Sequence, residues 1–311
     1  MREFIRSKGR SLYPSRERRV LLPYAILLSG FCFTLLVYHY FSKFTYEQDQ
    51  SRFQRVVQEI QDQVRLRIET STTLLRSGTG LFAASEAVDG GEFTRFVQQI
   101  ELEKNYPGIQ GIGFSRSFRR DEMDAIVARM EREGMKGFGV WPESPAREQY
   151  TSILYLQPES HLNKIAIGYD MFTESVRRQA METARDTGKP TASGRVTLVQ
   201  EQGVSNKQAG FLIYVPVYRK NVLLDTEAQR REALLGYVYS PFRVDDFLTP
   251  ITVEKNYDVS FVVYDGTELK PDNLMSAVTT DAPQDTAFSI TQPLPVAGRT
   301  WTLAYERKSV V

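Results

Sequence analysis

The chain contains one long apolar run, close to its N-terminus. Residues 20–41 read VLLPYAILLSGFCFTLLVYHYF and include no charged side chain. About 20 apolar residues in a helix cross the roughly 30 Å of bilayer hydrocarbon. A cleaved signal peptide usually has an apolar core of about 7–15 residues followed by a cleavage site of small residues. No such site follows residue 41, so the run predicts an uncleaved transmembrane helix.

Charged residues flank this run unevenly. Residues 1–19 hold seven Arg and Lys side chains against two Glu, and only Lys43 follows the run closely. The positive-inside rule therefore predicts a cytoplasmic tail at residues 1–19 and an exported remainder. Cys32, the only cysteine, lies inside the run, so the exported part has no disulfide. This favours a single-pass protein of a bacterial inner (cell) membrane whose folded part is periplasmic or extracellular.

An amphipathic pattern follows the run. Apolar residues recur three or four positions apart over residues 53–75, and residues 46–84 contain no proline. This spacing predicts a stalk helix at residues 45–90, ended by Asp89–Gly91. Its apolar stripe can pack on the chain's own folded part, or against the same helix of a second copy in a parallel homodimer, and the pattern is compatible with both.

The remaining chain alternates short apolar strands with amphipathic helices. Strands are expected at 111–118, 138–141, 150–156, 165–169, 195–200, 211–218, 234–239, 259–264, 287–291 and 300–306. Helices are expected at 92–104, 121–132, 173–187 and 244–248, with a charged connector at 221–232. Strands and helices that alternate without strict βαβ repetition predict an α+β fold with antiparallel sheets.

The composition offers little for catalysis. The 39 basic and 38 acidic residues nearly cancel, so the net charge does not indicate nucleic-acid binding. Only two histidines are present, His39 in the apolar run and His161 in a predicted turn, and neither lies in a metal-binding or nucleophilic motif. The segment Gly90–Phe93 echoes the GG(D/E)EF signature of diguanylate cyclases, but its place before an exported helix favours a helix stop. The pair Arg177 and Arg178 is expected on a solvated helix face. We therefore expect no catalytic residue, no metal site and no cofactor.

Six short blocks, in order, resemble a known family. They are YPGIQGIGFS at 106–115, AREQY at 146–150, GYDM at 168–171, Arg177-Arg178 with Ala180, ARDTG at 184–188 and YVPVY at 214–218. Together they resemble the CHASE domain, the extracytoplasmic input module of sensor histidine kinases, nucleotide cyclases, and diguanylate cyclases or phosphodiesterases. The blocks cover about residues 95–245.

This resemblance implies a domain layout and a ligand site. Residues 91–245 are expected to form a membrane-distal PAS-like subdomain that binds the ligand, and residues 246–311 a membrane-proximal PAS-like subdomain. In the plant cytokinin receptors of the family, an aspartate matching Asp170 contacts nitrogens of an adenine-type ligand. The residues that the resemblance and their chemistry assign to the ligand site are Asp170, Tyr169, Tyr214, Leu198, Phe114, Arg147 and Tyr150.

Two other roles for these residues stay open. Asp170 can cap the helix that starts near Thr173, and Arg147 can bridge a carboxylate that orders its loop. The plant receptors carry a threonine near the Pro-Val-Tyr motif, whereas this chain has Tyr214, whose phenol occupies space that cytokinin would use. The ligand is therefore expected to be another heterocycle, a purine-like molecule or a peptide-derived signal.

The combined expectation is a membrane-anchored sensor domain, not an enzyme itself. It would bind a small molecule, pair with a second copy through the stalk helix, and signal to a kinase or cyclase output module outside this chain. Nucleic acid is not an expected partner. The alternative is a membrane-tethered binding protein or envelope scaffold without signalling output.

Overall fold

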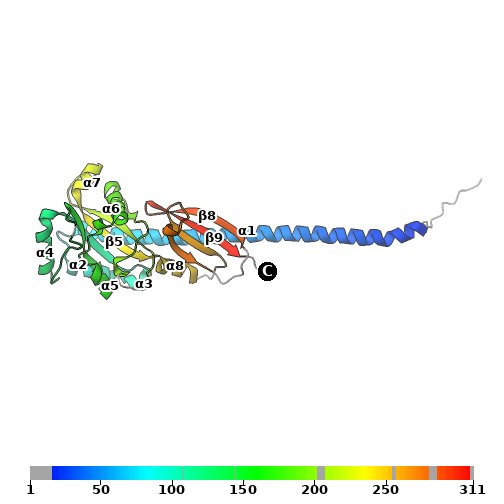
Figure 1. The fold of residues 1–311 in the computed structure, drawn as a ribbon, viewed down its shortest axis with the longest axis horizontal. Helices are drawn as coiled ribbons and strands as arrows, with labels where there is room; N and C mark the ends of the chain where they lie inside the picture. The colour runs from blue at the N-terminus through cyan, green and yellow to red at the C-terminus, as the bar shows by residue number, and fades with distance from the viewer. Residues whose placement is uncertain are drawn as a thin grey trace, which may run out of the picture. The chain divides into compact units, whose positions relative to one another are not determined.

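Helix α1 (Arg16–Ala84) is the first element of the computed structural model (Figure 1). The structure describes residues 16–106, 108–143, 145–201, 207–253, 257–279 and 286–308, so most of the predicted cytoplasmic tail lies outside the described residues. The chain divides into two compact units, Met1–Gln54 and Arg55–Val311, and α1 contributes to both.

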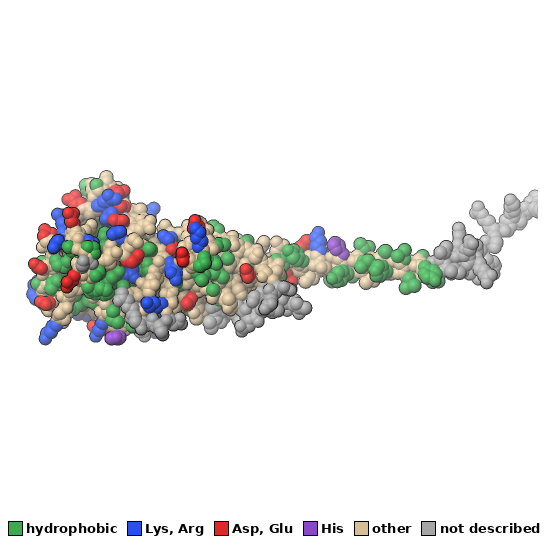
Figure 2. Space-filling view, in the orientation of Figure 1, with side chains coloured by type: hydrophobic (Ala, Val, Ile, Leu, Met, Phe, Trp, Pro, Cys, Tyr) green, Lys and Arg blue, Asp and Glu red, His purple; other side chains and the backbone are tan. Residues whose placement is uncertain are grey.

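The first unit contains the apolar run. From Pro23 on, α1 is the one helix in the described chain that is long and apolar enough to cross a membrane, and none of its apolar window is buried within the protein. Leu27, Leu36 and Tyr38 are each about 70% exposed. Figure 2 shows such hydrophobic side chains covering this part of the helix. An apolar helix surface without a protein covering is a candidate membrane span.

In the second unit, α1 buries its stripe against the chain itself. Val57, Ile60 and Val64 are at most 2% exposed. A Cβ on Gly78 would lie 2.9 Å from Val238, which shows how closely the helix approaches the sheet there. The prediction that the stripe packs on its own folded part is therefore confirmed, while pairing with a second copy stays a prediction. The helix ends at Ala84 rather than near residue 90.

Five antiparallel strands form the first sheet, in the order β2-β1-β5-β4-β3. Their bounds are β1 (Ile112–Arg119), β2 (Gln149–Gln157), β3 (Thr191–Ala192), β4 (Gly210–Tyr218) and β5 (Leu234–Arg243). Because side chains alternate along a strand, the two faces of this sheet carry different residues. One face meets α1, where Phe82 stacks on Phe114 with ring centroids 4.2 Å apart, and α2, where Phe93 stacks on Tyr155.

The helices of this region cover both faces. They are α2 (Gly90–Ile100), α3 (Leu102–Asn105), η1 (Arg120–Glu122), α4 (Met123–Arg132), α5 (His161–Ala166), η2 (Met171–Thr173), α6 (Ser175–Thr187), η3 (Val199–Glu201) and α7 (Glu227–Ala233). The face opposite α1 is covered by α5, η2 and α6, whose buried residues form one cluster with Leu212, Tyr214, Tyr237 and Tyr239 of the sheet.

A second antiparallel sheet follows α8 (Val244–Val253), in the order β7-β6-β9-β8. Its elements are β6 (Ser260–Asp265), η4 (Pro271–Asn273), β7 (Leu274–Val278), β8 (Thr286–Val296) and β9 (Arg299–Lys308). Trp301 of β9 is fully buried and meets Phe211 of β4 edge-on, with centroids 4.9 Å apart. A long apolar helix followed by two antiparallel sheets confirms the α+β prediction. The predicted boundaries of the two subdomains stay a prediction.

Three local predictions were wrong. The expected strand at 165–169 is instead the end of α5 followed by a turn, and the N-terminus of α5 is capped by the hydroxyl of Ser160. The expected strand at 138–141 makes only a single bridge, between Trp141 and Tyr169. Gly90 begins α2 instead of stopping a helix, because the Asp89 carboxylate accepts a hydrogen bond of 2.8 Å from the amide of Glu92.

The other differences concern short or interrupted elements. The helix expected at 92–104 is broken at Glu101, whose φ of 49° is left-handed. Most of the expected extended segment 195–200 lacks strand pairing and leads into η3. The charged connector contains α7, and the short strands β3 and β7 had no sequence prediction.

Candidate ligand-binding site

The buried layer between the first sheet and α6 contains three of the predicted ligand residues. Tyr214 of β4 is fully buried, Leu198 is 1% exposed and Tyr169 is 9% exposed. All three belong to one hydrophobic cluster together with Tyr237 and Tyr239 of β5. The structure therefore brings these three predicted residues together in an aromatic-rich core.

Helix α6 closes this layer because both of its ends are defined by the local sequence. The Glu174 carboxylate accepts hydrogen bonds of 2.9 Å from the amides of Val176 and Arg177, and thereby caps the N-terminus. Gly188, at φ 69°, ends the helix in the left-handed conformation that glycine tolerates. The helix buries Arg177, Ala180, Met181, Ala184 and Arg185.

Phe114 and Tyr150 lie on the opposite face of the sheet. Phe114 stacks on Phe82 of α1, and Tyr150 stacks on Phe118 with centroids 5.8 Å apart. Gly113, the neighbour of Phe114 on β1, is the residue that faces Tyr239. The structure therefore does not bring Phe114 into the layer that contains Tyr214.

Asp170 and Arg147 form an ion pair at the edge of β2. The fully buried Asp170 Oδ2 accepts hydrogen bonds from Arg147 Nη2 (2.6 Å) and Nε (3.1 Å). Its Oδ1 accepts from the amides of Thr151 (2.9 Å) and Phe172 (3.1 Å). The Arg147 guanidinium lies over the Tyr150 ring, 5.1 Å from its centroid. The bridge from Arg147 to a carboxylate is thus confirmed. Asp170 caps the short turn η2 rather than the helix expected from residue 173, which Glu174 caps. Contact of these residues with a ligand stays a prediction.

Arg177 is the polar group within the aromatic layer, and the expectation of a solvated position for it was wrong. Its side chain is 3% exposed and stacks over the Tyr169 ring, 5.2 Å from the centroid. Nη2 donates to the carbonyl of Thr197 at 2.9 Å. Burial raises the pKa of both Tyr214 and Tyr239, and the positive charge of Arg177 opposes this rise.

The helical spacing could have revealed this burial. Ala180, Met181 and Ala184 follow Arg177 by three, four and seven positions, which places all four residues on one face of the helix. The aromatic Tyr239 could have been found from the alternation along β5, where it shares a face with Tyr237.

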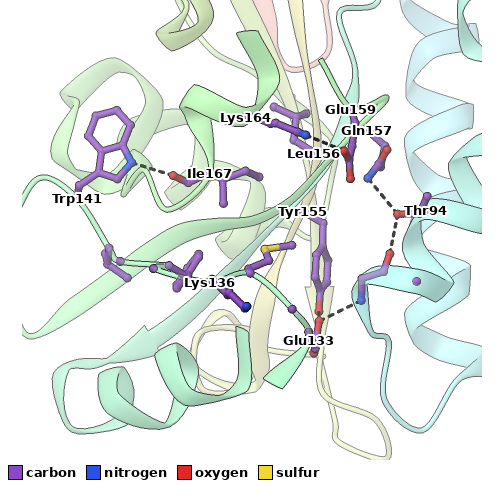
Figure 3. A pocket seen from close by; sticks show the side chains of 18 of the residues that line it. Thr94, Glu133, Lys136, Trp141, Tyr155, Leu156, Gln157, Glu159, Lys164 and Ile167 are labelled. Carbon is purple, nitrogen blue, oxygen red and sulfur yellow. Dashed lines mark hydrogen bonds and ion pairs between the residues drawn. The ribbon is translucent and has the colours of Figure 1, made fainter. Parts of the chain in front are cut away.

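A groove of about 1150 Å³ lies beside this layer (Figure 3). Its walls are the N-terminal turn of α2, residues 133–141, the end of β2 and part of α5. The Glu133 carboxylate accepts hydrogen bonds from Tyr155 Oη (2.7 Å), Arg129 Nε (2.8 Å) and the amide of Gly90 (3.1 Å). Burial, aided by the hydrogen bond to Glu133, raises the pKa of Tyr155. This network makes one end of the groove polar and fixed.

Trp141 and Ile167 lie where the groove meets the aromatic layer. Both residues line the groove, and both also pack against the hydrophobic cluster of the layer. The Trp141 indole Nε1 donates to the Ile167 carbonyl at 2.8 Å, as Figure 3 shows. Leu156 lines the groove as well and belongs to the cluster, so the groove borders directly on the hydrophobic layer.

The described residues contain no cluster of three or more His, Cys, Asp or Glu side chains that could hold a metal ion. No curated protein matches the chain. A solved structure of an extracellular ligand binding receptor from Desulfohalobium retbaense DSM5692 is similar at 12% identity and a TM-score of 0.41, over 84% of this chain and 39% of that chain. The CHASE domain model matches residues 86–276, which is more than half of the chain. The protein belongs to the CHASE domain family, whose members are extracytoplasmic sensory domains.

Proposed function

We propose that this protein is a membrane-anchored sensor that binds a small ligand in the layer between the first sheet and α6. The observation that carries this proposal is the arrangement around Trp141, where the groove borders on the hydrophobic cluster that contains the buried tyrosines. Binding sites for small molecules combine apolar and aromatic walls with a few polar groups. Turning the Trp141 side chain aside would connect the groove to that layer.

The ligand residues follow from this location. Tyr169, Tyr214 and Leu198 would contact the ligand body. Asp170 would reach the ligand only if Arg147 released it, because its two oxygens already accept four hydrogen bonds. Arg147 would then order the rim of the site, supported by the Tyr150 ring that its guanidinium covers. Phe114 is outside the proposed site because it faces α1.

The same proposal includes the route across the membrane. The N-terminus would lie in the cytoplasm of a bacterium, residues 20–41 would cross the inner membrane, and the two sheets would form PAS-like subdomains outside. Ligand binding would shift the equilibrium between two packing arrangements of these subdomains. The size of this shift is set by the difference in ligand affinity between the two arrangements. A homodimer through α1 would carry this change to a kinase or cyclase output module outside the chain.

Ligand binding is tested by thermal unfolding of the full chain in lipid nanodiscs. Adenine, other neutral heterocycles and short peptides serve as probes. A ligand at a hundredfold excess over its Kd stabilises the folded state by about 2.7 kcal/mol. We expect Tyr214→Phe, which keeps the ring but removes the hydroxyl, to change the Kd, and Phe114→Leu on the opposite face to leave it unchanged. Equal effects of the two substitutions would place the site elsewhere.

Signalling is tested with Cys32, which is exposed on α1 and is the only cysteine of the chain. In native membranes, oxidation should cross-link two copies through Cys32 if the helices pair. A ligand that transmits a signal should change the rate of this cross-linking. Binding without any change would favour the alternative of a tethered binding protein.

A further inference from the structure

Arg177 differs from the other buried arginines of the protein. Arg185, 9% exposed, donates to Asp186 at 2.6 Å, and Arg307, 8% exposed, lies 3.2 Å from the Asp258 carboxylate. Arg177 is the most deeply buried of the three, yet no carboxylate of the described chain lies within ion-pair distance of it. The nearby Glu174 uses its carboxylate to cap α6. A guanidinium stays charged in proteins, and burying a charge without a counter-charge is costly.

The hydrogen-bonding capacity of Arg177 is also largely unused. Nη2 donates to the Thr197 carbonyl, whereas Nε, which is shielded from solvent, has no hydrogen-bond partner among the described residues. The Tyr169 ring covers one face of the guanidinium. The group is therefore held flat and in place, with donors of its planar fork free to bind an acceptor.

Two buried phenols of the same hydrophobic cluster as Tyr169 add further donors to the layer. Tyr214 and Tyr239 are direct partners on neighbouring strands, with ring centroids 6.1 Å apart. Tyr239 Oη is buried without a hydrogen-bond partner in the described parts of the chain, and Tyr214 Oη reaches only the Met171 sulfur, at 3.5 Å. A thioether sulfur is a weak acceptor. The layer thus offers several donors and lacks strong acceptors for them.

We propose that the ligand of this site carries a carboxylate, which Arg177 binds through its planar fork and which Tyr214 and Tyr239 also bind through their hydroxyls. This inference rests on the proposed function, because it names the chemical class of the ligand for the same layer. A carboxylate has about four acceptor positions and matches the fork geometry of arginine. The tyrosine rings provide an apolar, aromatic surface for the ligand body. The ligand is thus a small aromatic or apolar carboxylate.

The test compares carboxylates with amides of the same shape, using the full chain in lipid nanodiscs. The probes are 4-hydroxybenzoate, phenylacetate and indole-3-acetate, each paired with its primary amide. We expect at least one of the three carboxylates to raise the melting temperature and its amide to have no effect. Titration calorimetry should show binding at least about 30-fold weaker in Arg177→Gln, because truncating one partner of a buried charged pair has an effect of this size.

Arg178→Gln is the matched control, since Arg178 is the next residue of α6 and is exposed. It should leave carboxylate binding unchanged. A second control addresses folding: in ligand-free protein, Arg177→Met should not lower the melting temperature, whereas Arg185→Met should lower it because Asp186 loses one of its two arginine partners. If Arg177→Gln does not fold, the comparison of carboxylate with amide on the unchanged chain still decides.

Three results would overturn the proposal. They are equal stabilisation by a carboxylate and its amide, undiminished carboxylate binding by Arg177→Gln, and no stabilisation by any of the three carboxylates. The neutral heterocycles distinguish this failure from a failure of the proposed function. If they stabilise the chain while the carboxylates do not, the sensor function stands and only the inference about the carboxylate falls.

Discussion

Replacing Asp170 with alanine should destabilise the protein severely, even though the residue lies in a proposed ligand site. The side chain is fully buried, and its two oxygens accept four hydrogen bonds. Removing it leaves the buried amides of Thr151 and Phe172 without their acceptor, at about 1–3 kcal/mol each. Arg147 also loses its partner, but its side chain is 19% exposed and water compensates part of that loss. We expect a total of about 3–5 kcal/mol.

Asp170→Asn separates the charge from the shape. An asparagine can keep its carbonyl oxygen toward the two amides, so only the charge-assisted bonds to Arg147 are lost, about 1.5–3 kcal/mol. A domain of this size loses about 2–4 °C of melting temperature per kcal/mol. Thermal unfolding followed by circular dichroism should therefore place Asp170→Asn between the unchanged chain and Asp170→Ala.

Lys164→Gln is the control for this series. Lys164 and Glu159 also form an ion pair, 3.0 Å apart, but both side chains are about two-thirds exposed. An exposed pair contributes about 0–1 kcal/mol. If Asp170→Ala and Lys164→Gln lowered the melting temperature equally, the bonds of Asp170 would not stabilise the fold and the reasoning above would be refuted.

Three further predictions concern other polar and glycine positions. Hydrogen bonds, above all from Arg231, hold the pKa of Asp186 below its usual range. The stabilising effect of this carboxylate is therefore complete at neutral pH and is lost as the pH falls toward the lowered pKa. The melting temperature of Asp186→Asn should lie below that of the unchanged chain at neutral pH and approach it below about pH 4, and a difference that stays constant would contradict this. Asp265→Asn should lower the free energy of unfolding, measured in urea, by about 2 kcal/mol. The Asp265 carboxylate accepts a hydrogen bond of 2.9 Å from the Arg195 amide and pairs with Arg299 of β9. Gly168→Ala should lower the free energy of unfolding by more than about 2 kcal/mol, since its φ is 81° and the new Cβ would lie 2.1 Å from the Gly139 carbonyl oxygen. An unchanged melting temperature would show that the segment shifts freely.

The sequence predicted the long elements because their patterns repeat over many residues. The stripe of α1 spans several helical turns, and β4 and β5 are rich in aromatic and β-branched residues. The strand prediction at 165–169 was wrong because an apolar pattern of five residues does not distinguish a strand from the end of a short helix. The capping signal of Ser160, three residues before the Asn163 amide that it accepts from, identifies α5 better than hydrophobicity does.

The candidate site was only partly predictable because faces and pairings are tertiary properties. Tyr169, Leu198 and Tyr214 meet in one layer, and their contact with a ligand stays a prediction. Phe114 looked equivalent in sequence, but the pairing of Gly113 with Tyr239 turns Phe114 to the other face. The ion pair of Arg147 with Asp170 joins residues 23 positions apart, and local sequence patterns do not link residues so far apart.

A short contiguous route connects the proposed ligand layer with the second sheet. Tyr214 is the strand partner of Thr191 in β3. The next residue, Ala192, donates from its amide to the Ala297 carbonyl between β8 and β9 at 2.8 Å. Farther along, the Arg195 amide donates to Asp265 of β6. A displacement of Tyr214 by a ligand would therefore act on residues that are hydrogen-bonded to the second sheet.

Contact alone does not establish coupling, so the route needs an energetic test. A double-mutant cycle of Tyr214→Phe and Asp265→Asn, measured as ligand affinity in titration calorimetry, gives the coupling free energy directly. Two residues that act through one connected element should show a coupling free energy of about 0.5–2 kcal/mol. Strictly additive effects would mean that Asp265 only stabilises the junction. Signal transfer would then require another connection, such as α1, whose Gln61 donates to Gln292 of β8 at 2.6 Å.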